Sequence, residues 1–378
     1  MVRAFEYFNL ETVFMDLAHY QTLGRSGLRV SPFCLGCMTF GDEWKAVGAG
    51  VDESLSVLET YIEAGGNFLD TANVYTHGHS EVIIGDYFAG TPLVARDRMV
   101  IATKFSGNMH PGDPNGGGSG RKAILHQLED SLRRLQTDYV DLYWCHFHDR
   151  HTPIEETMRT LDEIIRSGKA RYIGFSDSPA WVVVQAQYEA MLRNWSPLIA
   201  LQIEYSLAER TVEADLLPMA RELGLGVTPW SPLRAGVLSG KYRRDSRPEI
   251  GTTRVKADSP HLNDRNYEII DVLVSIAEEL GATPAQVALK WVQSRQGVAS
   301  TIIGARRRDQ LIDNLKALAV SLSGEQIRRL DQASEPKHSF PHPFLETLLP
   351  SAIQGGVRVN DVEGPRAEFL PAASEDRW

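Results

Sequence analysis

Cysteine is scarce in this sequence, which has only Cys34, Cys37 and Cys145 among its 378 residues. Three cysteines are too few, and an odd number, for a disulfide framework in a chain of this length, and such usage is typical of a reducing compartment. We therefore expect a cytoplasmic protein. Apolar runs long enough to cross a bilayer are also lacking, and acidic residues interrupt the first twenty positions, where a signal peptide needs a continuous apolar core.

Basic residues are in the minority, with 39 Lys and Arg against 49 Asp and Glu, which gives a formal net charge of -10. A broad basic surface is therefore not expected, and neither nucleic acid nor an anionic membrane is an expected partner. Any phosphate group has to be bound locally. Apolar residues make up 43% of the chain, enough for a large core at this length.

Eight short apolar runs alternate with longer segments of helical periodicity. The runs, which we interpret as strands, are residues 32–38, 67–72, 99–105, 140–147, 171–176, 198–205, 225–230 and 299–305. Segments between them, such as RKAILHQLEDSLRRLQ and PIEETMRTLDEIIRSGK, place apolar residues on one helical face. Because the runs are apolar on both faces, they predict parallel strands covered by helices. Eight such units predict an α/β fold, the (β/α)8 TIM barrel.

The limits of the regular pattern predict the domain organisation. We expect one barrel domain over residues 20–349, an N-terminal extension over 1–19 and a C-terminal tail over 350–378 that either forms an arm or is partly disordered. Residues 1–14 are either part of that extension or the product of an upstream start, with Met15 as the true one.

Three further segments lie outside the strand and helix rhythm. TLGRSGLRVS predicts a β-hairpin ahead of the first barrel strand, where it would cap the bottom of the barrel. Long loops are expected after the third strand, at 107–120, and after the seventh strand, at 231–265. Both loops leave the carboxyl ends of strands, where barrel active sites are built, so we expect them to be either functional or mobile.

Polar residues stand at the ends of three consecutive predicted strands. Asp70 ends the second strand, Lys104 lies at the end of the third and His146 at the end of the fourth, while Tyr75 follows on the loop after Asp70. Each alone has a structural explanation, such as a Lys–Asp ion pair. Together they would meet at one rim, where an ammonium lowers the pKa of a phenol, a carboxylate fixes the ammonium and an imidazole donates to a developing oxyanion. This set suits carbonyl reduction.

The stretch WCHFHDRH, residues 144–151, concentrates histidine, cysteine and aspartate, which are donors that zinc accepts. Because side chains alternate along a strand, Cys145 and His146 would point to opposite faces and could not easily share an ion. Lys104 would also oppose a cation beside His146. We therefore expect one active-site histidine followed by a variable rim, and no metal.

Several ordered motifs resemble the aldo-keto reductase family over most of the chain. FLDTANVY, SDSPAWVV, LQIEYSL and TPWSPLRAGVLSGKY are close to its aryl-alcohol-dehydrogenase-like branch, which is also similar to the β subunits of voltage-gated potassium channels. The resemblance implies a barrel that binds NADPH without a Rossmann fold. It further implies that Tyr75 is the proton donor, that Lys104 and Asp70 tune it, and that His146 orients the carbonyl.

The same resemblance implies a cofactor site of three segments. The residues expected to bind NADPH are Ser176, Asp177, Gln202 and Trp230 at the nicotinamide, Ser231, Pro232, Leu233, Arg234 and Lys241 at the pyrophosphate, and Gly304, Arg306, Gln310, Asp313 and Asn314 at the adenosine phosphate. Arginines 306 to 308 beside a helix N-terminus favour a phosphate dianion, and hence NADPH over NADH, although the last two could instead form a solvated basic turn. Asp177 departs from the family, which often has Asn there, and a carboxylate cannot donate as an amide does.

These features predict an NADPH-dependent oxidoreductase that reduces an aldehyde or ketone, aromatic or otherwise apolar, to the alcohol. The candidates for an apolar substrate wall are Trp44, Trp144, Phe147 and Tyr205, and His148 is either a further substrate-pocket residue or a surface histidine. The alternative is an NADPH-bound regulatory protein of the channel β-subunit type with little turnover, and a metal-dependent lyase or hydrolase comes third. The expected partner is a small-molecule carbonyl substrate, and the sequence leaves open whether the chain is a monomer or a homo-oligomer.

Overall fold

The computed structural model describes residues 17–90, 95–246, 255–256, 258–347 and 349–366. The chain divides into two compact units, one ending at Ser334 and the other beginning at Glu335. The hypothesis of an upstream start concerns residues 1–14, which lie outside the described residues, as do parts of the loop after the seventh barrel strand and of the tail.

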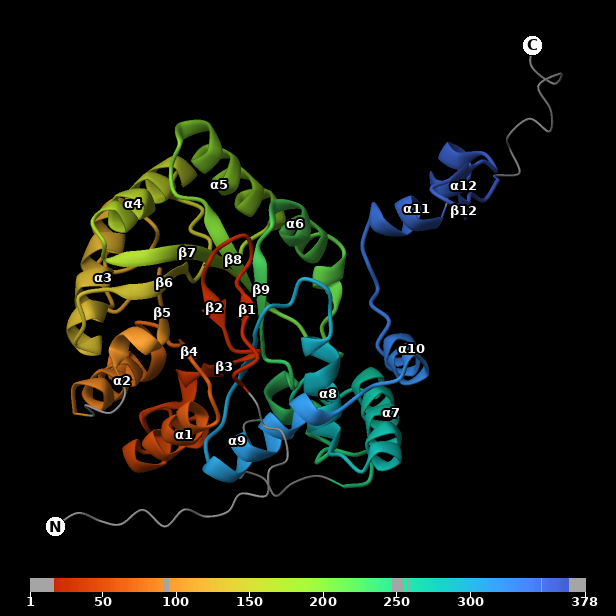
Figure 1. The fold of residues 1–378 in the computed structure, drawn as a ribbon, viewed down its shortest axis with the longest axis horizontal. Helices are drawn as coiled ribbons and strands as arrows, with labels where there is room; N and C mark the ends of the chain where they lie inside the picture. The colour runs from red at the N-terminus through yellow and green to blue at the C-terminus, as the bar shows by residue number, and fades with distance from the viewer. Residues whose placement is uncertain (1–16, 91–94, 247–254, 257, 348, 367–378) are drawn as a thin grey trace. The chain divides into compact units, whose positions relative to one another are not determined.

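Eight parallel strands form the centre of the first unit (Figure 1). They are β3 (Phe33–Gly36), β4 (Phe68–Asp70), β5 (Val100–Phe105), β6 (Val140–Cys145), β7 (Ala170–Ser176), β8 (Leu198–Glu204), β9 (Gly226–Trp230) and β10 (Thr301–Ile303). Their order, β10-β3-β4-β5-β6-β7-β8-β9, places strands that follow one another in the sequence side by side. The ring closes beside β10, where Val227 of β9 forms a parallel bridge with Val298 and accepts a hydrogen bond from Ala299 N at 2.9 Å. The predicted (β/α)8 barrel and its eight strands are confirmed.

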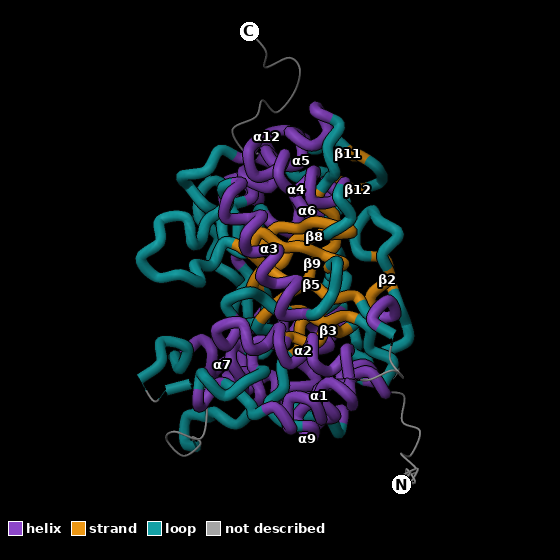
Figure 2. Tube along the Cα trace, turned by 90° about the vertical axis from the view of Figure 1, so that its left-hand side faces the viewer, coloured by secondary structure: helices purple, strands orange, loops and turns teal. Residues whose placement is uncertain are grey.

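The strands lie in the interior of this unit and the helices lie around them (Figure 2). The helices of this unit are α1 (Val51–Glu63), α2 (His79–Gly90), α3 (Arg121–Leu135), α4 (Ile154–Arg166), α5 (Ala180–Arg193), α6 (Leu216–Leu223), α7 (Asp264–Leu280), α8 (Pro284–Gln293), α9 (Arg308–Leu315) and α10 (Gly324–Ala333). Short 3-10 helices are η1 (Cys37–Thr39), η2 (Lys45–Val47), η3 (Tyr75–Gly78), η4 (Arg96–Arg98), η5 (Thr211–Glu213), η6 (Arg234–Ser239) and η7 (Lys316–Ala319). Two α-helices, α7 and α8, therefore stand between β9 and β10.

The start of α8 shows how local sequence sets a helix boundary. Thr283 and Gln286 form a capping box, in which each side chain accepts from the backbone N–H of the other residue at 3.2 Å, and Pro284 occupies the first turn. Taken singly, none of the described helices has both the length and the apolar composition of a membrane span. The consecutive helices α7 and α8 meet that criterion only as a pair, across a bend of 98°.

The predicted hairpin is present as β1 (Gln21–Thr22) paired antiparallel with β2 (Arg29–Val30). Gly24, at φ 60°, turns against the first residues of β8 and β9, because a Cβ there would lie 2.2 Å from Ile199 O and 2.6 Å from Gly226 N. Leu23 and Val30 are buried in the cluster that fills the barrel. The hairpin therefore closes the amino-terminal end of the barrel and leaves the opposite rim uncovered by this hairpin.

The core has two layers, one inside the barrel and one between strands and helices. The inner layer contains Phe68, Leu142 and Trp144, and the outer layer includes Tyr143 and Phe105. This separation follows from alternation, since successive residues of β6 point to opposite faces.

The second unit contains the helices α11 (His342–Thr347) and α12 (Leu349–Gln354) and a two-stranded antiparallel sheet. Its strands are β11 (Arg358–Val359) and β12 (Val362–Glu363). The unit begins before residue 350, where the sequence pattern placed the start of the tail.

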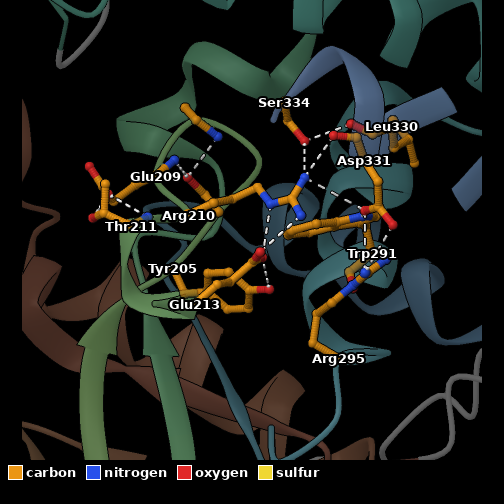
Figure 3. A network of polar contacts seen from close by, with 12 residues as sticks. Tyr205, Glu209, Arg210, Thr211, Glu213, Trp291, Arg295, Leu330, Asp331 and Ser334 are labelled. Carbon is orange, nitrogen blue, oxygen red and sulfur yellow. Dashed lines mark hydrogen bonds and ion pairs between the residues drawn. The ribbon is translucent and has the colours of Figure 1, made fainter. Parts of the chain in front are cut away.

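A buried polar network holds the loop after β8 against the C-terminal helices of the first unit (Figure 3). Arg210 donates from Nε and Nη2 to the two carboxylate oxygens of Glu213 at 2.8 and 2.9 Å. Its Nη1 donates to Ser334 Oγ at 2.8 Å and to Asp331 O at 2.9 Å. The carboxylate of Glu213 also accepts a hydrogen bond from Tyr205 Oη at 2.6 Å. The guanidinium thus links η5 to α10.

The indole of Trp291, on α8, packs against two arginines of this network. Its Nε1 donates to Asp331 Oδ1 at 2.8 Å, and the guanidinium carbons of Arg210 and Arg295 lie 5.2 and 4.1 Å from its ring. Burial opposes the charge of Arg210, but Glu213 outweighs it and the pKa of the guanidinium is raised. A cation that is buried in this way is stable only while its partners stay in place.

We predict that Arg210→Met, which keeps the apolar stem, lowers the free energy of unfolding by about 3 kcal/mol, because Glu213 then remains partly buried without its cation. The matched control is Arg244→Met, whose ion pair with Asp264 is exposed on both sides, so that its loss should lower the free energy of unfolding far less. Urea denaturation measures both variants. Equal losses in the two variants would contradict a stabilising role for the network.

Candidate active site

Four polar side chains meet at the carboxyl-terminal rim of the barrel. Asp70 ends β4, Lys104 lies near the end of β5, His146 directly follows β6, and Tyr75 opens η3 on the loop after β4. Register explains the convergence, because Asp70 pairs with Ala102 and the inward face of β5 reaches Lys104 two residues later. The sequence-predicted group is therefore brought together by three neighbouring strands and one loop.

Lys104 is fully buried and uses all three donors of its ammonium group. Nζ forms a short ion pair with Asp70 Oδ2 and donates to Thr71 O at 2.9 Å and to Tyr75 Oη at 3.0 Å. Burial lowers the pKa of the ammonium, but Asp70 and Tyr75 outweigh it, so the pKa is raised. Lys104 therefore remains a cation, fixed in direction toward the phenol.

The pKa of Tyr75 differs from the sequence expectation. Burial raises the pKa of the phenol, and the opposing effect of Lys104 does not cancel it, so the pKa lies above its ordinary value rather than below it. The expectation of a lowered pKa counted the ammonium and left out desolvation, which sequence does not show. At neutral pH, Tyr75 consequently holds its proton and can act as an acid.

His146 is a neutral imidazole in this environment. It is 7% exposed, and burial together with the charge of Lys104 lowers its pKa to about 2. Its ring lies edge-on to Tyr75, with 5.8 Å between the centroids, and stacks on Phe147 at 4.0 Å. The buried Nδ1 makes no hydrogen bond within the described part of the chain. A neutral imidazole can still donate one hydrogen bond to a substrate oxygen.

Asp70 also connects opposite sides of the barrel. While one carboxylate oxygen pairs with Lys104, Oδ1 accepts from Gln202 Nε2, on β8, at 2.9 Å. Beside it, Trp230 at the end of β9 donates from Nε1 to Asp177 Oδ1 at 2.9 Å. Asp177 faces the open rim. Desolvation by the surrounding protein nevertheless raises the pKa of its carboxyl to about 6, although the hydrogen bond from Trp230 acts to lower that pKa.

A cavity of about 1000 Å³ opens at this rim, with Asp70, Tyr75 and His146 in its wall. Such a volume is at the upper end for small-molecule sites, which leaves room for a dinucleotide and a second small ligand. The expected cofactor residues in the wall are Asp177, Gln202, Trp230, Ser231, Pro232, Leu233, Arg234, Lys241, Gly304, Arg306, Gln310, Asp313 and Asn314. Trp44 and Phe147, from the candidate substrate set, also lie there.

The segment after β9 enters the cavity in an uncommon backbone conformation. Ser231, Arg234 and Ala235 all have positive φ values, 53°, 48° and 54°. Left-handed conformations cost non-glycine residues of order 1 kcal/mol each and concentrate at ligand sites. The ion pair of Arg234 with Glu204 and the hydrogen bond from Ala235 N to Ser231 Oγ at 3.3 Å hold this turn.

The far end of the cavity is formed by β10 and the start of α9. Arg306 N donates to Gln310 Oε1 at 3.0 Å, and Gln286 Nε2 donates to Asp313 Oδ1 at 2.7 Å. Arg306 belongs to the wall. Arg307 instead pairs with Asp309 at 3.0 Å on an exposed surface, which agrees with the alternative that Arg307 and Arg308 form a solvated basic turn. One arginine of the three thus faces the cavity.

Residues 32–335 match the profile of the aldo/keto reductase family. The chain belongs to the aldo/keto reductase family. It is 34% identical to a putative aryl-alcohol dehydrogenase of Saccharomyces cerevisiae, over 87% of this chain and 90% of that protein. It is 39% identical to an uncharacterized oxidoreductase of Bacillus subtilis, over 87% and 98%. It is 34% identical to an aryl-alcohol dehydrogenase [NADP(+)] of Phanerodontia chrysosporium, over 86% and 88%.

Three candidate substrate residues of this aldo/keto reductase lie away from the cavity wall. Trp144 shares the inward face with His146 but lies one layer deeper, fully buried against Gly174, where a Cβ would come within 2.4 Å of the indole. Tyr205 points outward and belongs to the Arg210 network. His148 lies edge-on to Trp181, with 5.8 Å between the ring centroids. Depth inside the barrel accounts for the position of Trp144, and alternation along β8 accounts for that of Tyr205.

Ser176 is also set back from the cavity. It ends β7 level with Gln202 and is fully buried, so that Asp177 reaches the wall in its place. Cys145 likewise points away, with Sγ 3.6 Å from Ser119 Oγ, while His146 faces the cavity. Cys145 and His146, two potential metal ligands of the histidine-rich stretch, therefore point to opposite sides of β6.

The cavity wall also includes residues that the sequence prediction omitted. They include Met38, Thr39, Val74, Glu204, Ser239 and His261. Glu204 was open to prediction, because it lies two residues after Gln202 on the same strand and so on the same face. His261 was not, because it follows a long loop whose path no periodicity describes.

We predict that the fluorescence of Trp230 titrates with a midpoint near pH 6, as Asp177 changes charge beside the indole. The wild type minus Asp177→Asn difference isolates this signal from the six other tryptophans. Asn keeps an acceptor for the indole N–H but cannot titrate. A difference curve with a midpoint near 4, or none, would contradict the raised pKa.

Proposed function

We propose that this aldo/keto reductase uses NADPH to reduce an aldehyde or ketone with an aromatic or otherwise apolar group to the alcohol, with Tyr75 as the proton donor. The observation that carries the proposal is the hydrogen-bonded set of Asp70, Lys104 and Tyr75 beside a neutral His146 in the cavity wall. The names of the relatives, which include aryl-alcohol dehydrogenases and norsolorinic acid reductases, agree with this chemistry.

The residues of the cavity suit a nicotinamide dinucleotide, which supplies a hydride when bound. Trp230, Asp177 and Gln202 offer an aromatic face and polar groups for a nicotinamide. The left-handed turn after β9 and Lys241 would hold the pyrophosphate. Arg306, at the opposite end beside the start of α9, would face the adenosine phosphate, where a guanidinium suits a dianion.

The protein's own part in the reaction is to place and move one proton. Tyr75 holds the proton at neutral pH, because burial raises the pKa of its phenol. On transfer to the carbonyl oxygen, the phenolate that remains is stabilised by the Lys104 ammonium 3.0 Å away. His146 donates a hydrogen bond to the same carbonyl oxygen and so orients it. Asp70 keeps Lys104 charged and directed.

Two aromatic side chains in the cavity wall support an apolar substrate. Trp44 lies edge-on to Tyr75, with 6.3 Å between the ring centroids. Phe147 is 46% exposed although it stacks on His146, so one of its faces is open. Together they flank the proton donor, and aromatic rings at 4.5–7 Å spacing attract one another.

We predict that Tyr75→Phe lowers kcat for an aromatic aldehyde by about a thousandfold, because the ring remains but the proton is lost. The matched control is Tyr188→Phe on α5, an exposed tyrosine outside the cavity, which should keep wild-type turnover. NADPH oxidation, followed by absorbance, measures both. Turnover of Tyr75→Phe within tenfold of wild type would contradict the mechanism. If the wild-type protein binds NADPH tightly but has negligible turnover with every compound of a carbonyl panel, the alternative of a regulatory protein is favoured.

We predict that Arg306→Gln raises KM for NADPH by about tenfold or more and leaves KM for NADH within about threefold, because only NADPH carries the additional phosphate. Arg307→Gln is the matched control, since that arginine pairs with Asp309 outside the cavity. Equal effects of Arg306→Gln on the two cofactors would argue against NADPH selection by this residue.

A further inference from the structure

Two histidines and an aspartate converge on the outer face of the barrel, away from the active-site cavity. His126 and Asp130 lie four residues apart on α3, hence on one helical face, and His110 comes from the loop after β5. One ligand atom from each lies within 4.8 Å of the other two. The rings of His110 and His126 have centroids 5.7 Å apart. We propose that these three side chains bind a divalent transition-metal ion such as Zn²⁺.

The donor set and its spacing suit zinc. Two imidazoles and a carboxylate, with water in the fourth position, are ordinary zinc ligands, and donors on a tetrahedral ion at roughly 2.0–2.2 Å lie about 3.3 Å from one another. His126 Nδ1 and Asp130 Oδ2 are 3.3 Å apart. Arg133 pairs with the other oxygen of Asp130, Oδ1, so it leaves Oδ2 on the side of the histidines. The exposed position of both histidines gives an ion access from solvent.

Hydrogen bonds of its backbone fix the loop at His110 before an ion binds. His110 N donates to Asn108 Oδ1 at 2.7 Å, and His110 O accepts from Asp113 N at 2.9 Å. At the base of the loop, Gly118 N donates to Ser106 O at 2.8 Å. The loop therefore presents the histidine from a defined turn, which lowers the ordering cost of binding.

An ion at this position would join the loop after β5 to α3. The same loop contacts the residues that follow β6, because Ser119 N donates to Asp149 Oδ2 at 3.0 Å. None of the three donors lines the active-site cavity. The ion would therefore stabilise a loop that leaves the Lys104 strand, without entering the reaction.

Isothermal titration of the metal-free, full-length protein with ZnCl2 tests the proposal. We expect one ion per chain, and a Kd raised at least about tenfold in both His110→Ala and His126→Ala, because each removes a direct ligand. The control for exposed histidine is His19→Ala, and the double variant His338→Ala/His342→Ala controls for the histidine pair near the C-terminus, whose rings lie 5.9 Å apart. Both controls should bind as wild type.

Limited proteolysis gives a second readout of the same event. Zn²⁺ should slow cleavage within residues 107–119 in the wild type and leave the rate unchanged in His110→Ala. Absence of zinc binding, an unchanged Kd in the His110 and His126 variants, or loss of binding in the His338/His342 variant would each overturn the proposal. These readouts do not depend on carbonyl reduction, so they stand apart from the proposed function.

Discussion

The buried ion pair between Lys104 and Asp70 is the interaction on which the active site depends. An ammonium removed from water is costly unless it is paired and its remaining protons are accepted. Here Asp70 supplies the charge, while Thr71 O and Tyr75 Oη accept the other two donors. The barrel makes this possible, because β4 and β5 are adjacent and parallel and end at the same rim. The loop after β4 then has to pass over Lys104, which brings Tyr75 to the ammonium.

The other properties of the site follow from that fixed positive charge. It helps to keep His146 neutral, so that the imidazole can donate a hydrogen bond to a carbonyl without competing as an acid. It also stands ready to stabilise the phenolate of Tyr75, although burial keeps the phenol protonated until the reaction. Because Asp70 binds Gln202 as well, the pair is tied to the opposite strand β8, beside the residues proposed to hold the nicotinamide. The residues proposed for catalysis and those proposed for the cofactor thus share one rim of the barrel.

The barrel and the meeting of Asp70, Tyr75, Lys104 and His146 could be predicted from the sequence, because both depend on period and on strand ends, which are local signals. The direction of the Tyr75 pKa shift could not be predicted, since desolvation depends on packing. Trp144 and Tyr205, predicted at the substrate wall, lie outside the cavity wall, because nearness to a strand end does not say how deep a side chain lies or on which face. The meeting of His110 with His126 and Asp130 was also beyond prediction, because it depends on how an irregular loop folds back onto α3.

The pH dependence of the single-turnover rate of carbonyl reduction tests the central claim most directly. If Tyr75 is the acid and its pKa lies above the ordinary value of 10, the rate should be constant from about pH 7, above the titration of Asp177, to about pH 9 and fall only above that range. His146, with a pKa near 2, would contribute no change in this interval. A rate that falls with a midpoint near neutral pH would contradict the account, because it would identify a different proton donor.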